Sequence, residues 1–124
     1  MPDVTPYAYN AYVVSVYDGD TITVILDMGM GVQKKAKCRM HGIDTPELRG
    51  KTAKEKTAAK VARDRLRELI NEQTVLIQSL TKPDKYGRLL VKVWIDDGKI
   101  LVNDLLVEEG LARPYDGGKK SSWA

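Results

Sequence analysis

The chain has 124 residues, of which 43% are hydrophobic and 30% charged, as in an ordinary single globular domain. Its formal net charge of +3 is a mild tilt toward anionic partners. The single cysteine, Cys38, excludes an intrachain disulfide and a cysteine-based zinc site, and the single histidine, His41, excludes sites that need several histidines. We therefore expect Cys38 to be a small buried apolar side chain.

Neither a secretion signal nor a membrane span is predicted. Residues 1–10 contain no basic segment followed by an apolar one, and no stretch approaches the roughly 18 apolar residues of a membrane span. As written, the chain is expected to be an intracellular monomer without membrane partners, and it would be secreted only if a signal had been removed before this numbering. We expect one domain over residues 1–124, with irregular tails at residues 1–10 and 116–124.

A β-hairpin is predicted near the start of the chain. Residues 11–17 are rich in valine and carry tyrosine toward both ends, which favours a strand. The sequence Asp-Gly-Asp at residues 18–20 is typical of a tight turn. Residues 21–26 then form a second strand, whose inner face consists of Ile22, Val24 and Leu26.

After a glycine-rich turn at residues 27–31, residues 35–41 alternate strictly between apolar and basic side chains. This pattern predicts a third strand with one face toward solvent. The apolar face comprises Ala36, Cys38 and Met40. The face toward solvent comprises Lys35, Lys37, Arg39 and His41.

A long helix is predicted over residues 52–70, after a loop at residues 42–50 that contains Pro46. Thr52 and Glu55 form a candidate capping box at its start. The apolar positions have helical spacing, and they are Ala59, Ala62, Leu66, Leu69 and Ile70. The opposite face carries Lys54, Lys56, Lys60, Arg63 and Arg67.

The remaining elements complete a recognisable order. They are a strand at residues 74–79, a polar loop at 81–87, a strand at 88–95, a turn at 96–99, a short strand near Ile100, a helix at 103–109 stopped by Gly110, and an irregular end from 114. Three strands, a helix, two strands and a helix predict a mainly β protein with helices, a five-stranded OB-fold barrel.

Polar residues gather at three places at or near strand ends. They are residues 18–21 (Asp-Gly-Asp-Thr), Arg39 with residues 43–47 (Ile-Asp-Thr-Pro-Glu), and residues 84–88 (Asp-Lys-Tyr-Gly-Arg). Each segment alone is explained by turn or loop chemistry. A turn does not require the second carboxylate, Asp20, and a loop does not require two carboxylates and an arginine so close together.

Together these segments supply the groups that metal-assisted phosphodiester hydrolysis needs. Asp20 and Asp44 can provide carboxylate oxygens for a hard cation, and Glu47 is a candidate base for taking a proton from water. The guanidinium groups of Arg39 and Arg88 can bind the negatively charged oxygens of the transition state and never lose their charge.

In order and internal spacing, the three segments resemble the staphylococcal nuclease (thermonuclease) family over about residues 13–115. The resemblance implies that Asp20, Asp44 and the backbone carbonyl of Thr45 bind Ca²⁺. It also implies that Glu47 is the general base or positions the water, and that Arg39 and Arg88 contact the scissile phosphate. The implied activity is calcium-dependent cleavage of DNA and RNA, with single-stranded or frayed strands preferred and products that carry 3′-phosphates.

The same resemblance assigns four further residues. Lys85 and Tyr86 match positions that contact the terminal phosphate of the nucleotide, and Tyr115 matches a tyrosine beside the base. Asp18 matches an acid next to the metal ligands. The chain departs from the best-known member in ending about ten residues after Tyr115, too soon for a third helix, and in its short loop at residues 48–51. The ending resembles that of short-tailed members of the family, and it bears on stability and on the far wall of the nucleotide pocket. The short loop is expected to leave the substrate more open, and neither departure bears on the catalytic set.

Three alternatives remain open at this point. A non-catalytic OB-fold module that binds nucleic acid would have no need of three acids, which repel phosphate. A different nuclease signature is imitated by Pro83-Asp84 with residues 97–99 (Asp-Gly-Lys), although turn chemistry explains the second half. A scaffold protein is supported only by mild basicity and by the charged face of the long helix, which is also suited to attracting a polyanion.

Overall fold

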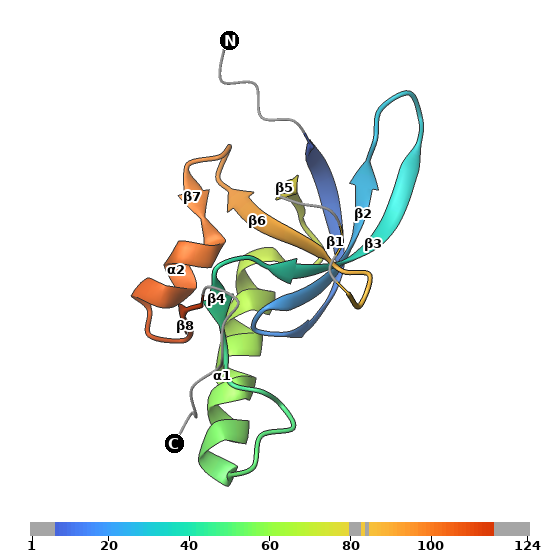
Figure 1. Ribbon diagram of the computed structural model, residues 1–124. Coiled ribbons are helices and arrows are strands. Elements are labelled where there is room, and N and C mark those ends of the chain that lie inside the picture. Colours follow the sequence, from blue (N-terminus) through green and yellow to red (C-terminus); the bar gives the residue numbers. More distant parts are fainter. Residues whose placement is uncertain (1–6, 80–82, 84, 116–124) are drawn as a thin grey trace.

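The computed structural model describes residues 7–79, 83 and 85–115 of the chain (Figure 1). In chain order the elements are β1 (Ala8–Asp18), β2 (Thr21–Asp27), β3 (Gln33–Met40), β4 (Ile43–Asp44), α1 (Ala53–Ile70), β5 (Thr74–Ser79), β6 (Leu89–Ile95), β7 (Ile100–Leu101), α2 (Val102–Glu108) and β8 (Arg113–Pro114). Neither helix in these residues has the length and apolar character needed to cross a membrane.

Within the described residues, five strands close into a barrel. The main sheet has the order β3-β2-β1-β5-β6-β7, and an additional parallel pairing of β3 with β6 joins its two sides. Helix α1 connects β3 and β4 to β5, so it lies between the third and fourth barrel strands in chain order. The predicted OB-fold is therefore confirmed.

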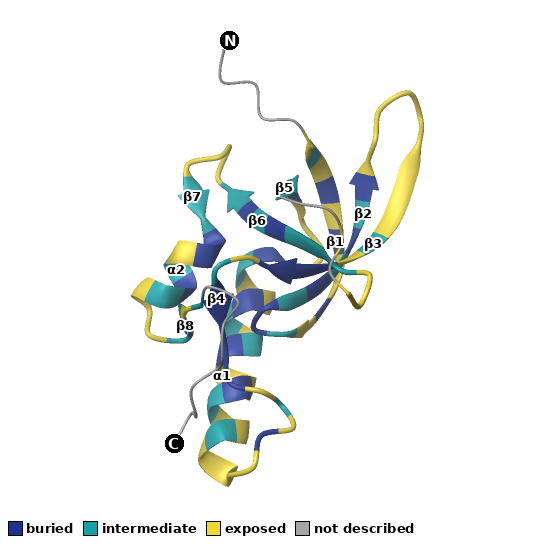
Figure 2. Cartoon of the chain, in the orientation of Figure 1, coloured by how far each residue is buried: buried dark blue, intermediate teal, exposed yellow. Residues whose placement is uncertain are grey.

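The barrel core follows the alternation predicted from the sequence. Along β2, the side chains of Ile22, Val24 and Leu26 are buried, whereas the residues between them are half-buried. Leu66 and Ile70 of α1 join the same hydrophobic cluster, so the helix covers part of the barrel interior. Figure 2 shows the buried positions on the strands and on the face of α1 turned toward the barrel.

Cys38 belongs to this core, as expected, because its side chain is fully buried. Burial raises the pKa of its thiol to about 12. The thiol is therefore neutral and unreactive at physiological pH.

Two predicted irregular segments are instead paired as strands. Strand β1 begins at Ala8, and residues 8–12 pair with β5, so residues 8–10 are not part of an irregular tail. Ile43 and Asp44, expected in a loop, form β4 and pair with Pro114 and Arg113 of β8. Both predictions were wrong because the partner strand lies far along the chain and no local pattern reveals it. Residues 1–6 and 116–124 lie outside the described part.

The predicted cap of α1 is present. Thr52 has an extended backbone, and its Oγ1 accepts a hydrogen bond of 3.0 Å from the backbone N–H of Glu55. This bond satisfies one of the backbone donors that a helix leaves open in its first turn.

Asn103 of α2 fills a gap in the hydrogen bonding of β6. One edge of β6 pairs with β3 up to Val91 and with β7 from Trp94 onward. Between them, Asn103 Oδ1 accepts a bond from the Val93 N–H, and Nδ2 donates to the carbonyls of Val91 and His41 at 3.1 and 2.8 Å. The buried amide therefore joins α2 to the point where the barrel closes.

Candidate active site

A cleft of about 180 Å³ opens on the outer side of the barrel where several strand ends meet. The residues that line it come from the end of β1, the start of β2 and the turn between them, from β3, from the loop after β4 and from the position just before β6. They are Tyr17, Asp18, Asp20, Thr21, Arg39, Glu47, Leu48, Arg49 and Arg88. Five residues predicted from the sequence therefore share one cleft, namely Asp18, Asp20, Arg39, Glu47 and Arg88.

Gly19 allows the β1–β2 turn to approach the neighbouring segments closely. A Cβ atom at this position would lie 2.8 Å from Cγ2 of Thr45 and 2.9 Å from Cβ of Ala62. Any larger residue would therefore push the turn away from Thr45. The glycine of the Asp-Gly-Asp sequence thus brings Asp20 into contact with the loop after β4.

Asp20 is held in the cleft by hydrogen bonds from two threonines. Its Oδ2 accepts hydrogen bonds from the backbone N–H and from Oγ1 of Thr45, at 3.2 and 3.0 Å. Its Oδ1 accepts a bond of 3.1 Å from Oγ1 of Thr21. Both Asp20 and Thr45 are buried, so these bonds fix the carboxylate in one orientation.

Arg39 is buried, although the alternation of β3 placed it on the face toward solvent. Its guanidinium group donates to the carbonyls of Met40 and Ile43, at 2.7 and 2.9 Å. Its Nη2 also lies 3.4 Å from Oδ2 of Asp20 and 4.0 Å from Oδ1 of Asp44. The prediction of a wet position was wrong because these acids and carbonyls replace the water that a buried guanidinium would lose.

Asp44 lies beneath the cleft rather than in its lining. Its side chain is buried, and its second oxygen is 3.8 Å from Nε of Arg113 on β8. Arg39 thus lies between two buried carboxylates.

Asp18 lies beside Asp20 at the turn between β1 and β2. Its Oδ1 accepts a bond of 3.1 Å from the backbone N–H of Asp20. Burial, reinforced by the negative charge of Asp20, raises the pKa of Asp18 to about 7. Acids placed this close together favour a cation between or beside them.

The oxygen atoms of Asp20 in the cleft, and of the buried Asp44 and Thr45, form a donor set that fits a hard cation. Among the described residues, no group of three or more histidine, cysteine, aspartate or glutamate side chains is arranged to hold a metal. Asp20, Asp44 and the carbonyl of Thr45 offer oxygen ligands only, and Ca²⁺ accepts such ligands together with water.

Three further predicted residues, Lys85, Tyr86 and Tyr115, are not among those that line the cleft. Lys85 and Tyr86 are exposed and precede Arg88. The ammonium group of Lys85 and the guanidinium group of Arg88 each lie 5.2 Å from the centre of the Tyr86 ring. Tyr115 is half-buried, and its backbone N–H donates to the carbonyl of Gly42, just before β4. Asp84, the first residue of its motif, lies outside the described residues.

Sequence reasoning missed four residues that line the cleft: Tyr17, Thr21, Leu48 and Arg49. Thr21 belongs to the Asp-Gly-Asp-Thr turn, so its proximity was available from the motif. The other three follow from how the loop after β4 folds over the β1–β2 turn, which no local pattern encodes.

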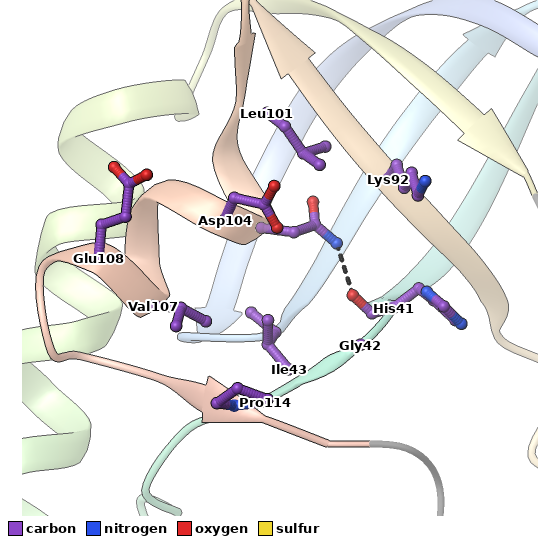
Figure 3. Close-up of a pocket in the computed structure, with 10 residues that line it drawn as sticks. His41, Gly42, Ile43, Lys92, Leu101, Asp104, Val107, Glu108 and Pro114 are labelled. Atoms are coloured by element: carbon purple, nitrogen blue, oxygen red, sulfur yellow. Dashed lines mark hydrogen bonds between the residues drawn. The ribbon is translucent and has the colours of Figure 1, made fainter.

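A second cavity of about 390 Å³ lies between α2, β8 and the β3–β4 turn (Figure 3). Apolar side chains such as Ile43, Leu101 and Val107 line it, together with Lys92 and Asp104. The floor is formed in part by Asn103, whose amide is already bonded to the backbone. None of the predicted site residues lines this cavity, so it is a less suitable candidate for phosphate chemistry.

The alternative signature ending at Lys99 gains no support from the described residues. Asp97, Gly98 and Lys99 are exposed in a tight turn between β6 and β7, and the Lys99 N–H donates to the carbonyl of Asp96. Asp96, Asp97 and Gly98 all have positive φ, as expected of a hairpin turn.

The chain is thus an OB-fold barrel with acids and arginines gathered at one cleft, and barrels of this class often bind oligonucleotides or oligosaccharides. Residues 37–122 match the family described as "Staphylococcal nuclease homologue", and the chain belongs to that family. It is 39% identical over 102 residues to a thermonuclease of Staphylococcus hyicus, covering 82% of this chain and 56% of the relative. It is 34% identical over 99 residues to a thermonuclease of Staphylococcus intermedius, covering 79% and 55%.

A third relative is Endonuclease YncB of Bacillus subtilis (strain 168), which is 38% identical over 98 residues. That match covers 77% of this chain and 43% of the relative. The chain thus spans about half the length of the curated relatives that it matches.

Proposed function

We propose that this protein is a calcium-dependent nuclease that hydrolyses phosphodiester bonds in DNA and RNA and leaves 3′-phosphates. The observation that carries the proposal is the shared cleft of Asp18, Asp20, Glu47, Arg39 and Arg88. The names of the similar proteins, two thermonucleases and an endonuclease, support it. Single-stranded or frayed strands are the expected substrates, because the scissile phosphate must reach the small cleft.

In this proposal, Glu47 takes a proton from the water that attacks the phosphorus atom. It is exposed and lines the cleft, so water reaches it freely. As the new bond from oxygen to phosphorus forms, the bond to the 5′ oxygen breaks, and that oxygen takes up a proton. The phosphate consequently stays on the 3′ side of the cut.

Arg39 and Arg88 stabilise the charge that gathers on the phosphate oxygens. They approach the cleft from β3 and from the start of β6, two strands that pair directly with each other. Asp20, Asp44 and the carbonyl of Thr45 would hold the calcium ion, with Asp18 supporting the backbone of Asp20. When bound, the cation supplies Lewis-acid polarisation of the phosphate and a positive charge among the acids.

The test is cleavage of single-stranded DNA by the wild-type chain with Ca²⁺ or with chelator, beside Glu47→Gln with Ca²⁺. We expect cleavage only with calcium, and a turnover about 10²–10⁴-fold lower in the variant, which is the range for losing a general base. Calcium affinity should change far less than turnover.

Three outcomes would contradict parts of the proposal. Full activity in chelator would remove the calcium requirement. Equal losses of turnover and calcium affinity in Glu47→Gln would make Glu47 a metal ligand rather than a base. Binding without cleavage by well-folded wild type would favour a non-catalytic OB-fold module.

A further inference from the structure

We propose that the outer face of the β2–β3 hairpin, with Lys35 and Lys37 in line with Arg39, binds the phosphate backbone of a single polynucleotide strand running on from the cleaved bond. This inference rests on the proposed nuclease function and deepens it. It implies that the preferred substrate is a polymer, whereas a dinucleotide would use the cleft alone.

The lysine row, defined as Lys35 and Lys37, begins where the cleft ends. Successive side chains of a strand point to opposite faces, so residues two apart share a face and lie about 7 Å apart. Lys37 and Lys35 are therefore the next outward positions of β3 after Arg39, which itself lines the cleft. The row leads directly away from the groups that would contact the scissile phosphate.

The neighbouring strand presents uncharged side chains beside this row. On β2, Thr21, Thr23 and Ile25 are opposite Arg39, Lys37 and Lys35 respectively. Thr21 also lines the cleft, which makes the two strands one continuous surface. A threonine hydroxyl can donate a hydrogen bond to a phosphate, and no carboxylate interrupts the face between Thr21 and Ile25.

Strand β1 extends the same face with an aromatic side chain. Tyr12 is paired with Ile25 and is exposed, so its ring lies on the outer face. Tyr17, also exposed, lines the cleft at the other end of β1. Aromatic rings beside a basic row are suited to stacking the bases of a single strand.

Both lysines are exposed, and the hairpin projects from the barrel where a long ligand can reach it. Figure 1 shows β2 and β3 side by side as they extend beyond the other strands, and Figure 2 shows the part of β3 nearest the hairpin turn as mostly exposed. The comparable face of other OB-folds, formed by their second and third strands, also binds oligonucleotides.

The far end of the face has a boundary. Asp27 is opposite Gln33 at the tip, and its carboxylate accepts a hydrogen bond of 2.9 Å from the Gly29 N–H. The acid closes the turn and places a negative charge beyond Lys35. The row therefore offers two phosphate contacts and no more along this strand.

The basic side of α1 is less suited to this role. Arg63, Arg65 and Arg67 each lie within 4.0 Å of a carboxylate, at Asp64 or Glu109. Carboxylates of the protein itself therefore neutralise part of the positive charge of the helix, which leaves less of it to attract a polynucleotide. Its exposed lysines provide a matched control for the lysine row.

The test compares wild type, Lys35→Gln/Lys37→Gln and the control Lys54→Gln/Lys60→Gln, which makes the same charge change on exposed positions of α1. Initial rates with Ca²⁺ are measured on a single-stranded 12-mer of DNA and on a dinucleotide. For the lysine-row variant we expect KM for the 12-mer to rise roughly tenfold. We also expect the slope of log(1/KM) against the logarithm of the salt concentration to become less steep by about 1.4, which corresponds to two phosphate contacts on a single strand. Its kcat, its rate on the dinucleotide and the control variant should stay within twofold of wild type.

A lysine-row variant that matches the control in both KM and salt slope would overturn the proposal. If wild type cleaves neither substrate, the proposed nuclease function fails, and fluorescence polarisation with the 12-mer in chelator then decides the surface. Roughly tenfold weaker binding by the lysine-row variant alone supports the face, and equal binding overturns it. If the lysine-row variant binds the 12-mer as wild type does but is no longer retained on phosphatidylserine vesicles, the face is a lipid-binding surface and the proposal is wrong.

Discussion

Arg39 shows how one residue serves both structure and the proposed chemistry. Its guanidinium group satisfies two backbone carbonyls and lies between the buried carboxylates of Asp20 and Asp44. Arg88 differs, because it is half-buried and lies at the start of β6 beside the exposed ring of Tyr86. The two arginines were expected to be equivalent on sequence grounds, yet their removal has different structural consequences.

We predict that Arg88→Ala lowers turnover by about 10²–10³-fold, which is typical for losing one transition-state donor, with little change in stability. Arg39→Ala should lower turnover at least as much and should also reduce the free energy of unfolding by about 3–5 kcal/mol, because it removes the cation beside the buried carboxylate of Asp20, while Asp44 keeps Arg113. Initial rates and urea unfolding of both variants check this.

The matched control is Arg39→Lys, which keeps the positive charge but loses the planar fork. It should recover part of the lost stability and little of the rate. Equal stability of Arg39→Ala and Arg88→Ala would show that the buried ion pairs contribute nothing to folding.

At the scale of elements, the start of α1 depends on a local signal. Thr52 is the N-cap residue of α1, and its side chain accepts a hydrogen bond from the Glu55 N–H. The loop after β4, which carries Glu47 and lines the cleft, leads directly into this cap. We therefore expect the capping bond also to limit the motion of the loop that carries Glu47.

We predict that Thr52→Ala lowers the free energy of unfolding by about 1 kcal/mol, the usual cost of removing a threonine cap. Thermal or urea unfolding measures this. Thr57→Ala, an exposed threonine within α1, is the control and should not destabilise the protein, since alanine favours the helix interior. A loss in Thr57→Ala as large as in Thr52→Ala would argue against a specific cap.

At the scale of the whole molecule, the barrel closes through a short parallel pairing. Only residues 38–40 of β3 pair with residues 89–91 of β6 in the described chain. Asn103 continues the bonding of β6 immediately beyond this pairing and reaches the carbonyl of His41. Closure brings Arg39 and Arg88 to the same cleft, so the joint supports the site as well as the fold.

We predict that Asn103→Ala lowers the free energy of unfolding by about 2–3 kcal/mol, because the Val93 N–H and the His41 carbonyl lose their partner. Urea unfolding tests the stability, and hydrogen exchange of the Met40 and His41 amides should become faster. The neighbouring exposed acid gives the control Asp104→Asn, which should change neither measurement. Unchanged exchange in Asn103→Ala would place the joint elsewhere.

Much of the fold could be predicted from local patterns. Alternating apolar residues in β2, β3 and β6 identified the strands and their inner faces, and helical spacing with Thr52 as a cap identified α1. Where a strand lacked such a pattern, prediction failed: Ile43–Asp44 and Arg113–Pro114 are too short to show alternation, and the first residues of β1 are recognisable only from their partner β5.

The sequence by itself predicted the composition of the candidate site, because the acids and arginines stand in three segments whose order and spacing resemble those of the nuclease family. Only the tertiary structure decided which of them share a cleft, that Arg39 is buried between Asp20 and Asp44, and that Lys35 and Lys37 continue from it on one face. The physical reason is that periodicity records how each segment meets the core. The contacts that hold a site depend instead on pairings between distant segments, which form only when the barrel closes.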